Sequence, residues 1–179
     1  YATLITVNPE DVLGAAGVIF PGQGSSPPAM TALRASGMDE AIREVIRRGK
    51  PFFGVCLGLQ VLMDWTEEGE TDCLHVLAGT TLKLPPGLKV PHMGWNNVCQ
   101  AVSHPLWRGI ADDTRFYFVH SYYAHSAEPA EVAGTTAYGF SFISAAARAN
   151  IFAVQFHPEK SHRQGLTLLQ NFVRWDGGV

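Results

Sequence analysis

Hydrophobic residues along this chain fall into short strand-like runs that are separated by stretches with helical spacing. The first strand-like runs are residues 4–7, 17–20 and 51–55. Between the last two runs, apolar side chains recur at helical spacing over residues 38–46, and Gly49 marks the end of the predicted helix. Alternating strands and helices are typical of a parallel sheet covered by helices. We therefore predict an α/β fold, an open and mostly parallel sheet with flanking helices.

The pattern changes over residues 76–147, where apolar runs are shorter and are interrupted by Gly, Pro and Asn. The clearest runs in this part are residues 116–120 and 139–145. Such a texture predicts irregular or antiparallel strands that are inserted into the α/β frame. The frame resumes at residues 151–156, which are apolar except for Gln155.

A final helix is predicted after this strand, because Ser161 and Gln164 have the spacing of a capping box. The apolar positions expected to face the sheet are Leu166, Leu169, Phe172 and Val173. Neither an internal repeat nor a linker is visible in the sequence. We therefore expect one domain over residues 1–179.

Composition and charge narrow the classes of function. The 179 residues are 46% hydrophobic and 16% charged, which is usual for a folded protein and excludes disorder as the main state. The net charge of −3 comes from 13 basic and 16 acidic residues that are mixed along the chain, so no nucleic-acid partner is expected. No apolar run approaches the ~20 residues that cross a bilayer. We expect a soluble, cytoplasmic protein without a membrane segment.

The sequence contains no recognisable pattern for a metal or a cofactor. Cys56, Cys73 and Cys99 are too few and too far apart for a disulfide framework or a Cys-x-x-Cys zinc site. Gly22 and Gly24 match the first two glycines of a dinucleotide fingerprint, but Pro27 stands at the third. We therefore expect chemistry that needs neither a metal nor a cofactor.

The sharpest local feature is Cys56, which lies between Gly54 and Gly58 where an apolar strand meets a helical pattern. It resembles a nucleophile elbow, whose tight strand-to-helix turn requires small flanking residues. The N-terminus of the following helix is expected to favour the thiolate over the thiol. From this segment alone, a buried structural cysteine fits equally well.

A base for this thiol is present after the last strand. His157 follows residues 151–156 directly, and Glu159 lies two residues further on, across Pro158. Sites of α/β proteins collect at the C-terminal edge of the sheet, where this histidine is expected. The carboxylate would hold the imidazole tautomer and stabilise the imidazolium, which completes a Cys-His-Glu triad with Cys56. The other histidines are expected to be ordinary hydrogen-bonded residues.

A glycine turn at Gly22 and Gly24 supplies a third element, because exposed N–H groups of such a turn can bind an oxyanion. With the elbow and the His-Pro-Glu segment, it resembles the class I (triad) glutamine amidotransferases. The resemblance implies a flavodoxin-like fold and hydrolysis of L-glutamine to glutamate and ammonia through a thioester. It assigns Cys56 as nucleophile, His157 as base and Glu159 as its orienting group. The residues it places around glutamine are Gly22, Gly24, Leu57 and Gln60.

Three further segments resemble one branch of this family, the glutaminase subunits of imidazole glycerol phosphate synthase. They are residues 90–96, 116–123 and 156–161. The resemblance implies a heterodimer with a (β/α)₈ cyclase subunit, which would use the ammonia to form imidazole glycerol phosphate and AICAR in histidine biosynthesis. The positions that it places near the partner are His92, Met93, Trp95, Asn96, Tyr117 and Lys160. From the residues alone, ordinary core packing explains this aromatic group equally well.

Two other interpretations stay open at this point. One is a different enzyme with the same triad, such as a γ-glutamyl hydrolase or another amidotransferase subunit. The other is a non-catalytic binding protein that keeps the fold. The family pattern usually starts with a further strand and helix, and residues 4–7 align with the second strand. That N-terminal strand and helix are therefore expected to be missing from the sheet.

Overall fold

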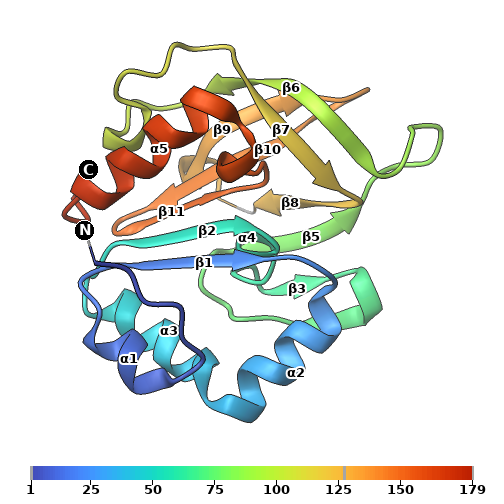
Figure 1. The fold of residues 1–179 in the computed structure, drawn as a ribbon. Coiled ribbons are helices and arrows are strands. Elements are labelled where there is room, and N and C mark those ends of the chain that lie inside the picture. The colour runs from blue at the N-terminus through green and yellow to red at the C-terminus, as the bar shows by residue number, and fades with distance from the viewer. Residues whose placement is uncertain (1, 127, 179) are drawn as a thin grey trace.

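The computed structural model describes residues 2–126 and 128–178 as one mixed sheet with helices packed against it (Figure 1). The helices are α1 (Pro9–Gly14), α2 (Ser26–Ser36), α3 (Met38–Arg47), α4 (Leu57–Gln60) and α5 (His162–Arg174). The strands are β1 (Val18–Gly22), β2 (Phe52–Cys56), β3 (Trp65–Thr66), β4 (Thr71–Asp72), β5 (Gly79–Lys83), β6 (His92–Gln100), β7 (Thr114–His120), β8 (Tyr122–Ser126), β9 (Val132–Ala137), β10 (Ser141–Arg148) and β11 (Ile151–Val154). Single 3₁₀ turns are η1 (Glu68–Glu70), η2 (Pro105–Trp107), η3 (Pro129–Glu131) and η4 (Pro158–Lys160). None of the described helices is long and apolar enough to cross a membrane.

The strand order is β1-β2-β11-β10-β8-β5-β3-β4, and β9, β6 and β7 extend from β10. Parallel pairing joins β1 to β2, β2 to β11 and β3 to β5. The strands between β6 and β10 pair antiparallel, because they are connected without the crossover helices that parallel neighbours need. The predicted α/β class with an antiparallel insertion is confirmed, although the described sheet is mixed rather than mostly parallel.

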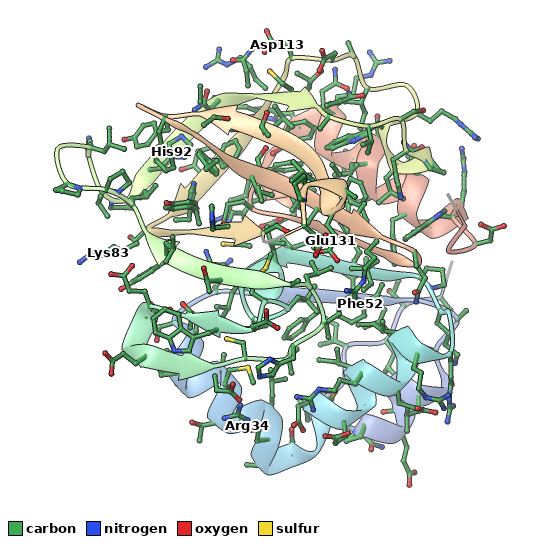
Figure 2. The ribbon with its side chains drawn as sticks, turned by 180° about the vertical axis from the view of Figure 1, so that it is seen from behind. Arg34, Phe52, Lys83, His92, Asp113 and Glu131 are labelled. Atoms are coloured by element: carbon green, nitrogen blue, oxygen red, sulfur yellow. The ribbon has the colours of Figure 1, made fainter. Side chains whose placement is uncertain are left out.

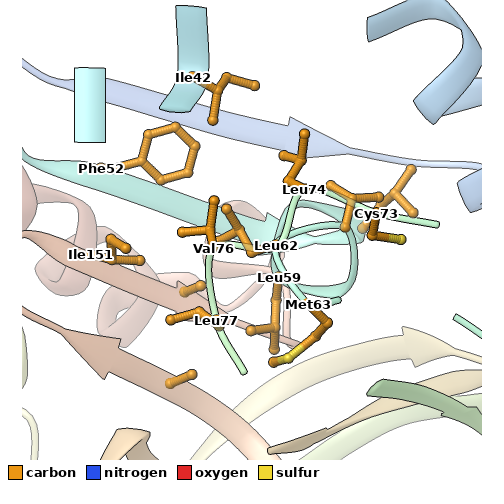
Figure 3. Packing of buried hydrophobic residues seen from close by; sticks show 14 of the residues in the cluster. Ile42, Phe52, Leu59, Leu62, Met63, Cys73, Leu74, Val76, Leu77 and Ile151 are labelled. Carbon is orange, nitrogen blue, oxygen red and sulfur yellow. The ribbon is translucent and has the colours of Figure 1, made fainter. Parts of the chain in front are cut away.

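Strand β2 separates two hydrophobic cores. Phe52 packs into a cluster with α1, α2 and α3, whereas Phe53 belongs to a second cluster with α5 and β7. Figure 3 shows the first cluster, where Ile42 and Ile151 lie on either side of Phe52. Figure 2 shows His92 of β6 and Arg34 of α2 on opposite sides of Phe52, which lies on β2. Burial on both faces explains why residues 51–55 form an uninterrupted apolar run.

The prediction of a strand at residues 4–7 is wrong. Leu4, Ile5 and Val7 are 72%, 101% and 85% exposed, and their segment is irregular. Among the described residues, β1 is the edge of the sheet, and residues 4–7 do not pair with it or with another strand. An apolar run becomes a strand only where a neighbouring strand pairs with it.

The prediction of a capping box at Ser161 is also wrong. The hydroxyl of Ser161 donates to the carbonyl oxygen of His157 at 2.6 Å and accepts the N–H of Tyr117 at 2.9 Å. It therefore ties the segment after β11 to β7 instead of capping α5. The buried face of α5 is Gly165, Leu168 and Phe172, and the predicted core residues Leu166 and Val173 are 58% and 37% exposed. A Cβ at Gly165 would collide with the Pro158 carbonyl, so close packing against η4 sets this face.

Candidate active site

Cys56 lies at the C-terminal end of β2, where the chain turns directly into α4. Its φ of 55° and ψ of −103° are rare for a residue with a side chain, and such strain often accompanies functional sites. The turn needs its two glycines. A Cβ at Gly54 would lie 2.9 Å from the Gly58 carbonyl oxygen, and a Cβ at Gly58 would collide with the Phe20 carbonyl oxygen. The geometry is that of the predicted elbow.

The glycine turn lies beside this elbow because β1 and β2 are parallel neighbours. Gly22 is the register partner of Cys56 at the end of β1. A Cβ at Gly22 would lie 2.7 Å from the Cβ of Leu57, so a larger residue would push the turn away from α4. Gly24 has a φ of +103°, which side-chain-bearing residues rarely adopt. The backbone of this turn therefore passes close to the thiol.

His157 reaches the same edge of the sheet because β11 pairs in parallel with β2. Its Nδ1 lies 2.7 Å from Glu159 Oε1, so Nδ1 carries the proton and donates it to the carboxylate. The Nε2 atom is buried and has no hydrogen-bond partner among the described residues, which leaves its lone pair free. The N–H of His157 donates to the carbonyl oxygen of Tyr117 at 2.9 Å and fixes the backbone.

The thiol of Cys56 is protonated in the resting site. Its Sγ donates to the Val119 carbonyl oxygen at 3.9 Å and accepts from Gln155 Nε2 at 3.6 Å. Burial raises the pKa of Cys56 to about 11, and the N–H of Leu57 and the Gln155 amide lower it by less. The expectation that the helix N-terminus would favour the thiolate is therefore wrong, because burial outweighs one N–H group. The thiol needs a base.

A pocket of about 380 Å³ opens over Cys56, a size suited to a small ligand. The residues that line it are Gln23, Gly24, Cys56, Leu57, Gln60, Glu68, Pro91, Val119, His120, Ser121, Tyr122, His157 and Lys160. Three of the predicted glutamine-binding residues are thus in its wall, and the fourth, Gly22, packs against the Leu57 side chain. Within residues 2–126 and 128–178, no three His, Cys, Asp or Glu side chains gather in a way that would hold a metal ion.

Glu68 is a pocket residue that sequence reasoning missed. Its Oε2 accepts the N–H of Ser26 at 2.7 Å, at the first residue of α2. This bond holds a carboxylate in the pocket wall, where it would attract a cationic group of a ligand. Glu68 lies in the short turn η1, within a stretch that carries no motif, so nothing in the sequence indicated it.

A second histidine in the pocket wall, His120, was also missed. Its Nδ1 lies 2.8 Å from the Tyr122 carbonyl oxygen, and its Nε2 lies 2.8 Å from His92 Nδ1. A carbonyl only accepts, so His120 Nδ1 carries the proton and His92 Nδ1 donates to His120 Nε2. Asn96 Nδ2 in turn lies 3.3 Å from His92 Nε2. Burial lowers the pKa of His92 to about 4 and that of His120 to about 3, so both stay neutral.

Of the residues expected near a partner, Met93 and Trp95 form an exposed patch on β6, where Met93 is the register partner of Val119 in the pocket wall. Met93 and Trp95 point to the same side of β6 and are 60% and 38% exposed. Trp95 packs edge-on against Tyr117 and stacks on His162, with ring centroids 6.0 and 5.1 Å apart. Lys160 is exposed and also lines the pocket. His92 and Asn96 lie beneath this face: His92 is buried, and the Asn96 amide binds it.

The family model for glutamine amidotransferase class-I matches residues 4–175. The chain belongs to the class I glutamine amidotransferase family. A relative from Nitrosomonas europaea, imidazole glycerol phosphate synthase subunit HisH, is 51% identical over 180 residues, which cover 96% of this chain and 84% of that protein. The subunit HisH of Dehalococcoides mccartyi is 49% identical over 175 residues, with coverages of 97% and 85%.

Solved structures show the same fold at lower identity. The Trypanosoma brucei CTPS glutaminase domain with bound acivicin has a TM-score of 0.67 and 18% identity, and the match covers 94% of this chain and 75% of that domain. A glutamine amidotransferase crystal structure has a TM-score of 0.71 at 18% identity, with coverages of 94% and 85%. The predicted fold is confirmed. So is the resemblance to the glutaminase subunits of imidazole glycerol phosphate synthase, and with it the expectation of an enzyme.

Proposed function

We propose that this protein hydrolyses L-glutamine at Cys56 as the glutaminase subunit of imidazole glycerol phosphate synthase. The arrangement of His157 carries the proposal. Its Nδ1 is bound to Glu159 Oε1 at 2.7 Å, and its Nε2 is buried and unpartnered among the described residues. The residue itself lines the pocket that contains Cys56. An imidazole held in this tautomer is ready to accept a proton at Nε2. The elbow presents the thiol, and the family membership supports the reaction.

The first half of the reaction forms a thioester. The Sγ–H bond of Cys56 breaks and its proton moves to His157 Nε2, while Sγ attacks the side-chain carbonyl carbon of glutamine. The charge that develops on the carbonyl oxygen is stabilised by N–H groups of Leu57 and of the glycine turn. The carbon–nitrogen bond then breaks, and the imidazolium gives its proton to the leaving ammonia.

The second half releases glutamate. A water molecule gives a proton to His157 Nε2, and its oxygen attacks the thioester carbon. The carbon–sulfur bond breaks, and the proton returns to Sγ. In both halves the Glu159 carboxylate keeps Nδ1 protonated and stabilises the imidazolium, as the third member of a triad does. No other reactant is needed.

The charges of the pocket fit an amino acid with its side chain pointing at the thiol. The Glu68 carboxylate is held in the wall by the N–H of Ser26 and would bind the α-ammonium group of glutamine. Gln60 and Gly24 line the same pocket as Glu68 and Cys56. These contacts would place the substrate amide over Cys56, which is the positioning that an attack on its carbonyl carbon requires.

The proposed partner is a (β/α)₈ cyclase, which would use the ammonia in histidine biosynthesis in the cytoplasm. The names of the relatives describe them as subunits of imidazole glycerol phosphate synthase. Met93 and Trp95 form an exposed apolar patch on β6, and Met93 is the register partner of Val119 in the pocket wall. Large exposed apolar and aromatic side chains are frequent in protein interfaces. A heterodimer formed through this face would cover the pocket rim and keep ammonia from water.

Replacement of Cys56 by serine tests the proposed reaction. Cys56→Ser should lower glutamate release by at least about 10³-fold, because a hydroxyl is a weaker nucleophile of similar volume. In the complex with the cyclase, synthesis from added ammonium salts should remain, since only the ammonia source is lost. Cys99→Ser, which changes an exposed cysteine outside the pocket, is the matched control and should retain activity. Substantial glutaminase activity in purified Cys56→Ser would reject the proposal.

A further inference from the structure

Gln155 is a fully buried amide that the reaction described above leaves unused. It follows β11 directly and precedes His157 by two residues. The residue is 0% exposed, and its backbone N–H donates to the Ser144 carbonyl oxygen at 2.9 Å. A buried amide side chain is costly unless its donors and acceptors are satisfied. The hydrogen-bond partners of the Gln155 amide therefore indicate the role of this side chain.

The two ends of the Gln155 amide contact two residues of the pocket wall. Its Oε1 accepts from Gln60 Nε2 at 3.1 Å, and its Nε2 donates to Cys56 Sγ at 3.6 Å. Gln60 Nε2 also donates to the Tyr122 carbonyl oxygen at 2.9 Å. Both hydrogens of the Gln60 amide are thus used, which leaves only the oxygen of Gln155 to face it. The Nε2 of Gln155 must then point at the sulfur.

The hydrogen bonds that run from Gln155 through Gln60 to the Tyr122 carbonyl oxygen are also fixed at the Tyr122 end. The Tyr122 carbonyl oxygen accepts a second hydrogen bond, from His120 Nδ1 at 2.8 Å. His120 is held in this tautomer because His92 Nδ1 lies 2.8 Å from its Nε2. A buried and fully satisfied polar network of this kind is rigid, since each bond restricts the next. The orientation of the Gln155 amide is therefore built into the fold before any substrate binds.

We propose that Gln155 is a catalytic residue of the glutaminase site, whose Nε2–H group holds the Cys56 sulfur and stabilises its negative charge. This inference rests on the proposed function. When His157 takes the thiol proton, the sulfur becomes an anion in a buried site, and an N–H group aimed at it gains most at that moment. The same bond stabilises the sulfur when it leaves during thioester hydrolysis.

The charged groups around the sulfur do not replace this donor. Glu159 raises the pKa of Cys56 and so opposes the thiolate, and Lys160 lowers it by less than the Gln155 hydrogen bond does. The N–H of Leu57 also lowers this pKa, by more than Gln155 does, and belongs to the backbone. The other titratable groups that line the pocket are Glu68, His120, Tyr122 and His157. All of them stay in place when Gln155 alone is changed. A change in thiol reactivity can then be attributed to the amide.

The test is the rate of Cys56 alkylation by iodoacetamide between about pH 7 and about pH 9, followed by peptide mass spectrometry. Below the thiol pKa this rate is proportional to the thiolate fraction. Gln155→Met removes the donor at nearly constant length, and Gln155→Glu replaces it with a carboxylate. Loss of a hydrogen bond to a charged group corresponds to about one pKa unit or more. The Met variant should therefore react about tenfold more slowly, and the Glu variant more slowly still.

The matched control is Gln170→Glu, which makes the same chemical change on the exposed side of α5. It should leave both the alkylation rate and glutamine hydrolysis unchanged. In the complex with the cyclase, both Gln155 variants should lose at least about tenfold in kcat with little change in KM, because the bond strengthens after substrate has bound. Folding of each variant is checked by circular dichroism and thermal unfolding.

Alkylation rates equal to wild type in folded Gln155→Met and Gln155→Glu would overturn the inference. Should neither variant fold, the wild-type protein still decides it: the Gln155 side-chain amide resonances must shift as Cys56 ionises, and a constant shift overturns the role. Alkylation of Cys56 needs no glutamine. It therefore tests the role of Gln155 independently of the proposed glutaminase activity. Wild-type protein that fails to hydrolyse glutamine with the cyclase contradicts the proposed function, whatever the alkylation rates show.

Discussion

Two histidines line the same pocket, His120 at the end of β7 and His157 after β11, and their surroundings differ at each ring nitrogen. The Nδ1 of His157 faces the carboxylate of Glu159 at 2.7 Å, and its Nε2 is buried without a partner among the described residues. The Nδ1 of His120 faces the carbonyl oxygen of Tyr122, and its Nε2 already accepts from His92. One imidazole can therefore take up a proton, and the other has no free lone pair.

The difference comes from the groups behind the two rings. A carboxylate stabilises the imidazolium that forms when Nε2 accepts a proton, whereas a neutral carbonyl gives less compensation for a buried charge. Protonation of His120 at Nε2 would also bring two N–H groups face to face, unless His92 changed its tautomer. Burial accordingly lowers the pKa of His120 to about 3. A place in the wall of the pocket that contains the thiol is thus not enough to make a histidine a base.

The largest expected effect separates the two histidines directly. His157→Ala should lower glutamine turnover by about 10³-fold or more, because general base catalysis and imidazolium formation are both lost. His120→Asn, which removes a ring that takes no proton, should stay within about tenfold of wild type. Glutamate release by both folded variants in the presence of the cyclase is the measurement. A larger loss for His120→Asn would reverse the assignment of the base.

The next effect concerns the group behind the base. Glu159→Gln keeps an oxygen that can accept the Nδ1 hydrogen but removes the charge that stabilises the imidazolium. Turnover should fall by about 10²-fold, which is less than for His157→Ala. Glu44→Gln is the matched control, because Glu44 is an ion-paired glutamate on α3, outside the pocket lining. If Glu159→Gln proves the more damaging change in folded protein, the roles of the two residues are wrong.

The sequence predicted those parts of the site that are continuous in the chain. Cys56 with its glycines and His157 with Glu159 are short motifs, and the parallel pairing of β2 with β11 brings them together. Glu68 and His120 enter the pocket through the turn η1 and an antiparallel strand, whose positions depend on tertiary packing. No local pattern reports such placement, so these residues became visible only in the structure.

In the fold too, local sequence patterns predicted some elements correctly, whereas others depended on tertiary packing. The run at residues 51–55 was identified because burial on both faces makes it continuously apolar. The run at residues 4–7 is also apolar, yet it lies outside the sheet. An apolar run forms a strand only when it is hydrogen-bonded to a neighbouring strand. Ser161 has a capping sequence, but its hydroxyl binds His157 and Tyr117. Local patterns fail where a distant partner competes for the same atom.

A smaller effect is expected where the pocket meets the exposed patch. Trp95→Ala should weaken cyclase binding by about tenfold, since truncation of an aromatic residue central to an interface typically costs 1–2 kcal/mol or more (about tenfold per 1.4 kcal/mol). Leu166→Ala is the matched control, because Leu166 is a 58% exposed apolar residue on α5, away from the pocket. Binding is measured by titration calorimetry. Equal affinities for wild type and Trp95→Ala would place the partner elsewhere.

Partner binding should also raise glutamine hydrolysis by wild-type protein. The glycines of the turn at Gly22 and Gly24 allow a peptide N–H to reorient at little steric cost, and contact at the rim can select the orientation that binds the oxyanion. At a limiting cyclase concentration, the Trp95→Ala variant should be stimulated less than wild type. At a saturating concentration, its stimulation should equal that of wild type. Equal turnover of free and bound wild-type protein would remove the gating and leave the triad unaffected.

The smallest effect is expected for a third histidine, His104. Within the described residues it shares an unpartnered Nε2 with His157, and it shares a pKa lowered by burial with His120. His104 has a buried Nε2 without a hydrogen-bond partner among the described residues, like His157, but its ring packs against Phe152 and Trp175. Burial lowers the pKa of His104 to about 4. An unfolded chain binds the proton near pH ~6.5, so between these values the unfolded state holds more protons and acid destabilises the fold. His104→Phe removes this term.

The variant should therefore differ little from wild type near neutral pH, where neither state of His104 is charged. Its loss of the hydrogen bond from the Leu106 N–H to His104 Nδ1 is offset by removal of the unpartnered Nε2–H group. As the pH falls from about 7 to about 5, the urea midpoint of wild type should drop further than that of His104→Phe. The two curves should diverge progressively below about pH 6.5. If the urea midpoints of the two proteins fall in parallel over this range, His104 protonates equally in the folded and unfolded states. Burial would then not keep this histidine neutral.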